Sequence, residues 1–280
     1  MVEKIIEQYR LTPDETKVFR QYLAEKANME NYICEWDLSF LNLWDDIYRY
    51  AMFFGVDEAI NHYLCPKLPI EFTKPVPIKL EFYESFCGRL PVLYIEDAEL
   101  FEKVVTNVVY KGNPPESLSE TGASFVFGKR TRFMILSNKP YSNVPAEEIG
   151  LPREDWLQKS MVIRREHECT HYYTKLAFHR SEFHMHDELV ADFFGFYEAF
   201  GSFSADYFLR CIGVLPGSGH RLHFYTSHFS DNLQQAIAKS VELAAMSLEM
   251  FSKTDCFLNM SREKRINQLY TTSLAEMIDM

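Results

Sequence analysis

The sequence lacks any long uninterrupted run of apolar residues. No stretch of about 18 such residues occurs in the 280-residue chain, so we expect no membrane-spanning helix. The first residues, Met1 to Glu7, also lack a basic segment followed by an apolar one, which is the pattern of a signal peptide. We therefore expect a cytoplasmic protein that has no membrane partner.

Positive charge is scarce relative to negative charge. The 29 lysine and arginine residues face 40 aspartate and glutamate residues, which gives a formal net charge of -11. Because the average field of such a chain repels a polyanion, we expect no nucleic-acid partner. The one dense basic stretch, residues 129–132, is interpreted as a solvated strand face, and a local anion site is the alternative.

The cysteines lack any paired spacing. Six cysteines are scattered along the chain and none forms a CxxC pair; they stand at positions 34, 65, 87, 169, 211 and 256. Together with the expected absence of a secretory signal, this scatter favours reduced thiols in a cytoplasm over a disulfide framework.

Three regions that differ in their sequence patterns follow one another along the chain. Residues 1–65 form a predicted N-terminal helical segment, residues 66–150 a small sheet-containing region, and residues 151–280 a second helical region. The order of helices, sheet and helices predicts an α+β fold, and we expect one compact catalytic unit overall.

Individual elements are predicted from caps and periodicity. Thr12-Pro13-Asp14-Glu15 is a capping box with proline at the first helical position, so a helix is expected to start there. The other expected helices span 37–64, 97–109, 153–179, 187–200, 231–251 and 261–278. Alternating apolar residues predict strands over 78–82 and 91–95 and a strand or hairpin over 124–137.

One motif carries recognisable catalytic chemistry. Residues 167–171 read His-Glu-Cys-Thr-His and fit HExxH within the helix expected over 153–179. Residues four apart on a helix share a face about 5–6 Å apart at Cβ, so His167 and His171 can occupy two corners of a tetrahedral zinc site. Glu168 is rotated by about 100° from His167 and can instead accept a proton from a water molecule at the metal.

The next expected helix supplies acidic residues at the same spacing. Residues 188–192 read Glu-Leu-Val-Ala-Asp, an ExxAD pattern. An HExxH helix followed by ExxAD resembles the gluzincin-type zinc metallopeptidases, and this resemblance covers residues 167–192. It implies a zincin-like fold, mostly helical with a small mixed or antiparallel sheet before the HExxH helix. It also implies Zn2+ as cofactor and a peptide or small amide as substrate.

The same resemblance assigns roles to the two acids of ExxAD. Glu188 would be the third metal ligand, and Asp192 would hydrogen-bond a ligand histidine and fix its tautomer. Glu188 follows His171 by 17 positions, which is short for this class, and residue 187 is Asp where many members carry Asn. Four other side chains therefore remain candidates for the third ligand: Asp187, His184, His186 and Asp192. The metzincin pattern is excluded, because Thr174 and Ala177 stand where it needs Gly and His.

Peptide hydrolysis also needs a donor for the oxyanion that forms on the substrate. Residues 219–225 offer four candidate side chains just after a glycine-containing turn, namely His220, Arg221, His223 and Tyr225. His223 and Tyr225 are two apart and would share a face if the segment is extended. We predict these two as catalytic donors, and an ordinary polar loop is the alternative.

These features predict a zinc-dependent metallohydrolase, a peptidase by resemblance, whose oligomeric state is left open. A helical di-iron protein is one alternative, but it needs two Glu-x-x-His motifs and only residues 168–171 supply one. A non-catalytic or structural metal-binding protein of zincin-like fold is the other. A structural zinc site would have a fourth protein ligand, for which His184 or His186 is the candidate.

Overall fold

A computed structural model describes residues 1–32, 37–128, 131–179 and 184–280. Two compact units make up the chain. We call Met1–Glu35 with Ser142–Met280 the helical unit, and Trp36–Tyr141 the sheet unit. This division differs from the expected one, because the first N-terminal helices belong with the C-terminal helices, whereas the helices between residues 40 and 64 belong with the sheet.

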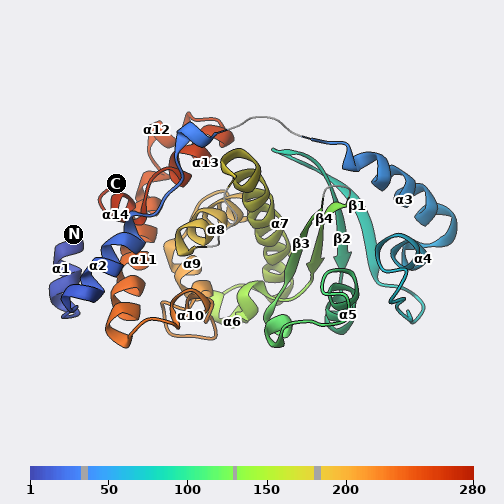
Figure 1. Ribbon diagram of the computed structural model, residues 1–280, viewed down its shortest axis with the longest axis horizontal. Helices are drawn as coiled ribbons and strands as arrows, with labels where there is room; N and C mark the ends of the chain where they lie inside the picture. Colours follow the sequence, from blue (N-terminus) through green and yellow to red (C-terminus); the bar gives the residue numbers. More distant parts are fainter. Residues whose placement is uncertain (33–36, 129–130, 180–183) are drawn as a thin grey trace. The chain divides into compact units, whose positions relative to one another are not determined.

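The sheet unit contains a four-stranded mixed sheet (Figure 1). Its strands, in the spatial order β1-β2-β4-β3, are β1 (Ile78–Ser85), β2 (Gly88–Ile95), β4 (Arg132–Ser137) and β3 (Ala123–Phe127). β2 and β4 are parallel, and the other two pairs are antiparallel. Every residue of β4 is buried, as expected for a strand with neighbours on both sides and apolar cover. The expectation of a small mixed or antiparallel sheet is thus confirmed in its mixed form.

The helix expected over 37–64 is interrupted. It consists of α3 (Phe40–Phe54), the short α4 (Val56–Ala59) and the π-helical turn η2 (Ile60–Leu64). Gly55 separates the first two with a φ of 101°, a conformation that glycine adopts without steric cost. The remaining helical segments of the sheet unit are α5 (Ala98–Val108), which is capped by Asp97 and contacts β2 and β4, and the 3-10 turn η3 (Glu116–Glu120).

Lys129 and Arg130 of the basic stretch lie outside the described residues. Arg132 is described, and its buried guanidinium donates to the backbone carbonyls of Asp37 and Gly128. At this residue the interpretation as a solvated strand face is wrong, because the side chain turns inward and binds carbonyl groups.

The helical unit starts with three short segments and continues with a succession of helices (Figure 1). The N-terminal segments are α1 (Val2–Gln8), α2 (Pro13–Ala24) and the 3-10 turn η1 (Met29–Asn31). After the 3-10 turn η4 (Tyr141–Asn143), the helices are α6 (Ala146–Ile149), α7 (Arg153–Phe178), α8 (Met185–Phe200), α9 (Ala205–Ile212), α10 (Leu222–Thr226), α11 (Asp231–Phe251), α12 (Asp255–Leu258), α13 (Arg262–Tyr270) and α14 (Leu274–Met277).

Most helix predictions in this unit are confirmed. The Thr12 capping box forms with Glu15 and starts α2, and the three long helices α7, α8 and α11 match their expected spans. The helix expected over 261–278 is instead divided into α13 and α14, because Ser273 and Glu276 form a new capping box. Among the described residues, no helix combines the length and the apolarity that crossing a membrane demands.

The long helices α7 and α8 pack against each other in antiparallel order (Figure 1). Ile163 lies against Gly195, His167 against Asp192, and His171 against Glu188, so the partner on α8 moves backwards as α7 advances. At Gly195 the approach is close, because a Cβ atom there would lie 2.7 Å from the backbone oxygen of Ile163. α8 is buried at every residue from Met185 to Phe196, so its acidic side chains need partners inside the protein.

This packing reverses the usual effect of replacing a helical glycine. At an exposed helical position, alanine is favoured over glycine by about 1 kcal/mol. For Gly195→Ala we expect the opposite sign, a loss of about 1–2 kcal/mol in the free energy of unfolding, because α7 and α8 must separate to admit the methyl group. Urea denaturation of both proteins measures the difference, and a variant more stable than the parent would contradict the close packing.

Candidate metal centre

Two histidines of α7 and one glutamate of α8 converge inside the helical unit. The Nε2 atoms of His167 and His171 are 3.0 Å apart. The Glu188 carboxylate lies 3.2 Å from His171 Nε2 and 3.7 Å from His167 Nε2. We call these three residues the His–His–Glu cluster. One ligand atom from each lies within 4.8 Å of the others, so the structure brings together the three residues named as metal ligands from the sequence.

The local sequence explains this convergence. His167 and His171 are one helical turn apart, so their rings leave α7 on the same side. Because α8 runs antiparallel to α7, Glu188 of α8 lies next to His171 of α7. His167 is buried and Glu188 is 4 % exposed, so water surrounds neither side chain. A buried carboxylate needs a positively charged or hydrogen-bonding partner.

Asp192 holds the first histidine in a defined tautomer. Its Oδ1 lies 2.6 Å from His167 Nδ1, on the side of the ring opposite the cluster. A carboxylate accepts a hydrogen bond here, so Nδ1 carries the proton and Nε2 presents its lone pair to the cluster. This is the contact that the family resemblance implied for Asp192, and it is the usual arrangement behind metal-binding histidines.

Arg221 joins the two acids of α8. Its guanidinium donates to Asp192 Oδ2 at 3.0 Å, to Ser142 Oγ at 3.2 Å, and to Glu188 Oε2. The sequence named Arg221 among four candidate donors but did not select it. Two buried acids four residues apart on an apolar helix require a cation nearby, and that requirement is the signal that would have found it.

Charge interactions shift the pKa values in this cluster. Burial alone would raise the pKa of the Glu188 carboxyl, but the hydrogen bond to His171 and the charges of His171, His167 and Arg221 bring it below its ordinary value. Burial alone would lower the pKa of His171, but the hydrogen bond and charge of Glu188, with the charge of Glu168, raise it above 6.5. The cluster therefore holds a carboxylate and attracts positive charge.

Glu168 is half-buried and lies one residue after the first histidine. Its negative charge acts on His171, but its carboxylate makes no hydrogen bond or ion pair with any residue in the described part of the chain. Every other acid of the site is engaged, since Glu188 contacts the histidines and Asp192 contacts His167 and Arg221. Glu168 is thus the acid of this region whose carboxylate no described residue engages.

The two predicted oxyanion donors have different positions. The segment is helical over α10 and not extended, so residues two apart are rotated by about 200° and do not share a face. Tyr225 is half-buried, and the negative charge of the Glu188 carboxylate acts on its hydroxyl. His223 is exposed to solvent, so the prediction that it faces the site together with Tyr225 is wrong.

The other candidates for a third or fourth ligand are engaged elsewhere. His184 caps α8, and its Nε2 lies 3.3 Å from the Glu25 carboxylate. His186 Nε2 hydrogen-bonds the Thr272 carbonyl oxygen at 2.8 Å and that of Leu269 at 3.2 Å. Asp187 accepts a hydrogen bond from the His184 amide in the same cap. Among the described residues, the group of possible metal ligands therefore contains the His–His–Glu cluster and no fourth side chain.

The cluster fits a zinc ion in chemistry and in size. Two imidazoles and one carboxylate form a common ligand set of catalytic zinc sites, whereas structural sites have four protein ligands. Zinc–ligand bonds of about 2.0–2.1 Å place tetrahedral ligands about 3.3 Å apart. The two Nε2 atoms, 3.0 Å apart, and Glu188 Oε1, 3.2 Å from His171 Nε2, lie close to that separation, and Glu188 Oε2 lies 3.7 Å from His167 Nε2.

Comparison with known proteins identifies a family. The model of a family described as "Family of unknown function (DUF7005)" matches residues 129–280, more than half of the chain. The chain belongs to the DUF7005 family. The matched part of this DUF7005 protein contains the His–His–Glu cluster, Glu168, Asp192 and Arg221. Neither a curated protein nor a solved structure matches the chain.

We expect zinc binding to compete with protonation of His171. A protonated imidazole cannot bind a metal, so zinc affinity should be full above the raised pKa of His171 and fall as the pH decreases through it. The decline should therefore begin above pH 6.5, the ordinary pKa of the group. Calorimetry at several pH values, in buffers of different ionisation enthalpy, measures affinity and proton release. Affinity that stays constant down to pH 6 would contradict the assignment.

Proposed function

We propose that this DUF7005 protein is a zinc-dependent metallohydrolase, and that it acts as a peptidase. The observation that carries this proposal is the convergence of His167, His171 and Glu188, with the half-buried Glu168 carboxylate beside them and engaged by no described residue. Three protein ligands are the number found in catalytic zinc sites, where the remaining position is open to water or substrate. The resemblance of HExxH followed by ExxAD to the gluzincin-type metallopeptidases supports the choice of peptide substrates.

Glu168 is proposed as the general base. A zinc ion in the cluster would polarise the scissile carbonyl and acidify water. In this proposal the Glu168 carboxylate accepts the proton of the attacking water and returns it to the leaving amine. The absence of any hydrogen bond from Glu168 to the described residues leaves its oxygen atoms available for both transfers.

Tyr225 is proposed as a donor to the substrate oxyanion. Burial, followed by the negative charge of Glu188, raises the pKa of the Tyr225 hydroxyl, so the group stays protonated at neutral pH. A protonated phenol beside the cluster can donate a hydrogen bond to developing negative charge on a substrate oxygen.

Arg221 and Asp192 are proposed as positioning residues. Arg221 binds one oxygen of Glu188 through its guanidinium and leaves the other, Oε1, facing His171 at 3.2 Å. Asp192 fixes the orientation of the His167 ring through Nδ1. Both contacts set the direction in which a ligand atom points, and loss of such contacts typically weakens metal affinity by about 10–100-fold.

Glu168→Gln separates metal binding from catalysis. We expect the variant to bind zinc with unchanged stoichiometry and to lose hydrolysis by about 100-fold or more, because the amide cannot accept the proton. The measurement is digestion of a mixed peptide library by zinc-loaded protein, followed by mass spectrometry. The matched control is Glu154→Gln, which removes an exposed carboxylate from the first turn of the same helix and should leave turnover unchanged.

Two outcomes would contradict the proposal. Undiminished turnover of Glu168→Gln would remove Glu168 from the mechanism. Absence of any zinc-dependent cleavage by the parent protein, with zinc bound at one equivalent, would favour a non-catalytic metal protein over a hydrolase.

A further inference from the structure

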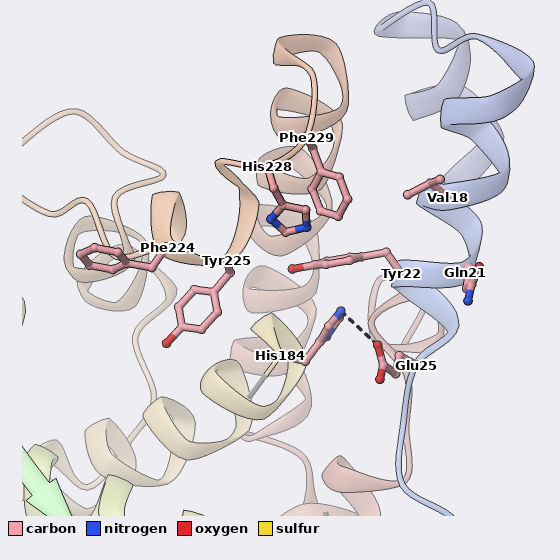
Figure 2. Close-up of a pocket in the computed structure, with 9 residues that line it drawn as sticks. All are labelled: Val18, Gln21, Tyr22, Glu25, His184, Phe224, Tyr225, His228 and Phe229. Atoms are coloured by element: carbon pink, nitrogen blue, oxygen red, sulfur yellow. Dashed lines mark ion pairs between the residues drawn. The ribbon is translucent and has the colours of Figure 1, made fainter. Parts of the chain in front are cut away.

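A pocket of about 420 Å³ lies beside the metal centre in the helical unit. Figure 2 shows its walls: side chains of α2 on one side, the start of α8 below, and the segment from α10 to Phe229 on the other. It is open to solvent and does not belong to the His–His–Glu cluster, whose three residues are absent from its lining. Its volume lies at the lower end of the range that is typical of ligand pockets.

Two of its wall residues connect the pocket to the cluster. Tyr225 lines the pocket, and the charge of Glu188 acts on its hydroxyl. His184 also lines it and caps α8 four residues before Glu188, which is a rise of about 6 Å along a helix. A group in this pocket would therefore sit one or two side chains away from the candidate metal site.

The lining that the structure describes is mostly aromatic and includes one carboxylate. Four of the nine lining residues are phenylalanine or tyrosine and two are histidine. Tyr22 packs on His184 with ring centroids 3.9 Å apart, and in Figure 2 its hydroxyl points towards the Tyr225 side. Among the lining residues that the structure describes, Glu25 is the one acid, and none is lysine or arginine. Aromatic faces and a carboxylate both attract cations.

The charges that act on the Tyr22 hydroxyl are negative. Burial raises the pKa of this hydroxyl, a backbone hydrogen bond with Met185 lowers it, and the negative charges of Glu25 and Asp187 raise it. The formal net charge of the whole chain, -11, has the same sign. Such a field disfavours acidic ligands.

We propose that this pocket binds the basic side chain of an arginine or lysine residue in the substrate, next to the bond presented to the metal centre. This inference rests on the proposed hydrolase function for the location of the bond, but the pocket and its charge do not depend on that function. The cation would lie between the aromatic rings and reach the Glu25 carboxylate, which His184 also contacts (Figure 2). A guanidinium has five N–H donors and can share that carboxylate with the imidazole.

The direct test compares a charged ligand with its neutral isostere. N-acetyl-arginine amide and N-acetyl-citrulline amide have nearly the same shape and differ in charge. Calorimetric titration of zinc-loaded Glu168→Gln protein should show arginine binding about tenfold more tightly than citrulline, the range expected for cation–aromatic contact with a nearby carboxylate. N-acetyl-phenylalanine amide tests the alternative of a neutral aromatic ligand. Equal binding of arginine and citrulline, or tighter binding of phenylalanine, would overturn the proposal.

Variants locate the interaction. Glu25→Gln should abolish the preference for arginine over citrulline, whereas Glu7→Gln removes an exposed carboxylate of α1 outside the pocket and should preserve it. Gln21→Lys changes an exposed residue one helical turn before Glu25 and supplies a competing ammonium group, so it should also remove the preference without disturbing the core. An unchanged preference in both pocket variants would place the cation site elsewhere.

The two proposals fail in different ways. If the pocket is correct and the hydrolase is not, arginine binding persists in metal-free protein while no peptide is cleaved. If the hydrolase is correct and the pocket is not, zinc-dependent cleavage of the peptide library occurs with no enrichment of arginine or lysine next to the cleaved bonds.

Discussion

The antiparallel contact between α7 and α8 is the constraint on which the rest of the site depends. Gly195 removes the side chain that would hold the two helices apart at Ile163. One turn further along α7, the same register places His167 against Asp192, and the next turn places His171 near Glu188. A shift of one residue in this register would rotate Glu188 away from the histidines by about 100°, so the packing of these helices fixes the geometry of the His–His–Glu cluster.

Electrostatics explains why this contact is stable with acids inside it. Glu188 and Asp192 are both buried on a helix that is otherwise largely apolar. The two acids share Arg221, whose positively charged guanidinium donates a hydrogen bond to each carboxylate. The cluster still retains enough negative charge to raise the pKa of His171. A divalent cation would satisfy that charge, which supports the proposal that the cluster binds a metal.

The spacing of residues along the chain predicted much of the candidate site, but not all of it. HExxH and ExxAD lie within two helices whose spans periodicity predicted well, so the helical turn fixed which side chains share a face. His223 was mispredicted because its orientation depends on whether residues 222–226 are helical, and short segments carry little periodic signal. The role of Arg221 and the grouping of α1 and α2 with the C-terminal helices depend on long-range packing, which spacing along the chain does not encode.

The most direct test of the account is a crystal structure of zinc-loaded protein with anomalous diffraction measured on both sides of the zinc absorption edge. We expect one strong anomalous peak within bonding distance of His167 Nε2, His171 Nε2 and one oxygen of Glu188, with Asp192 still bound to His167 Nδ1. A peak at another set of residues, or a fourth protein side chain completing the coordination of the same ion, would contradict it.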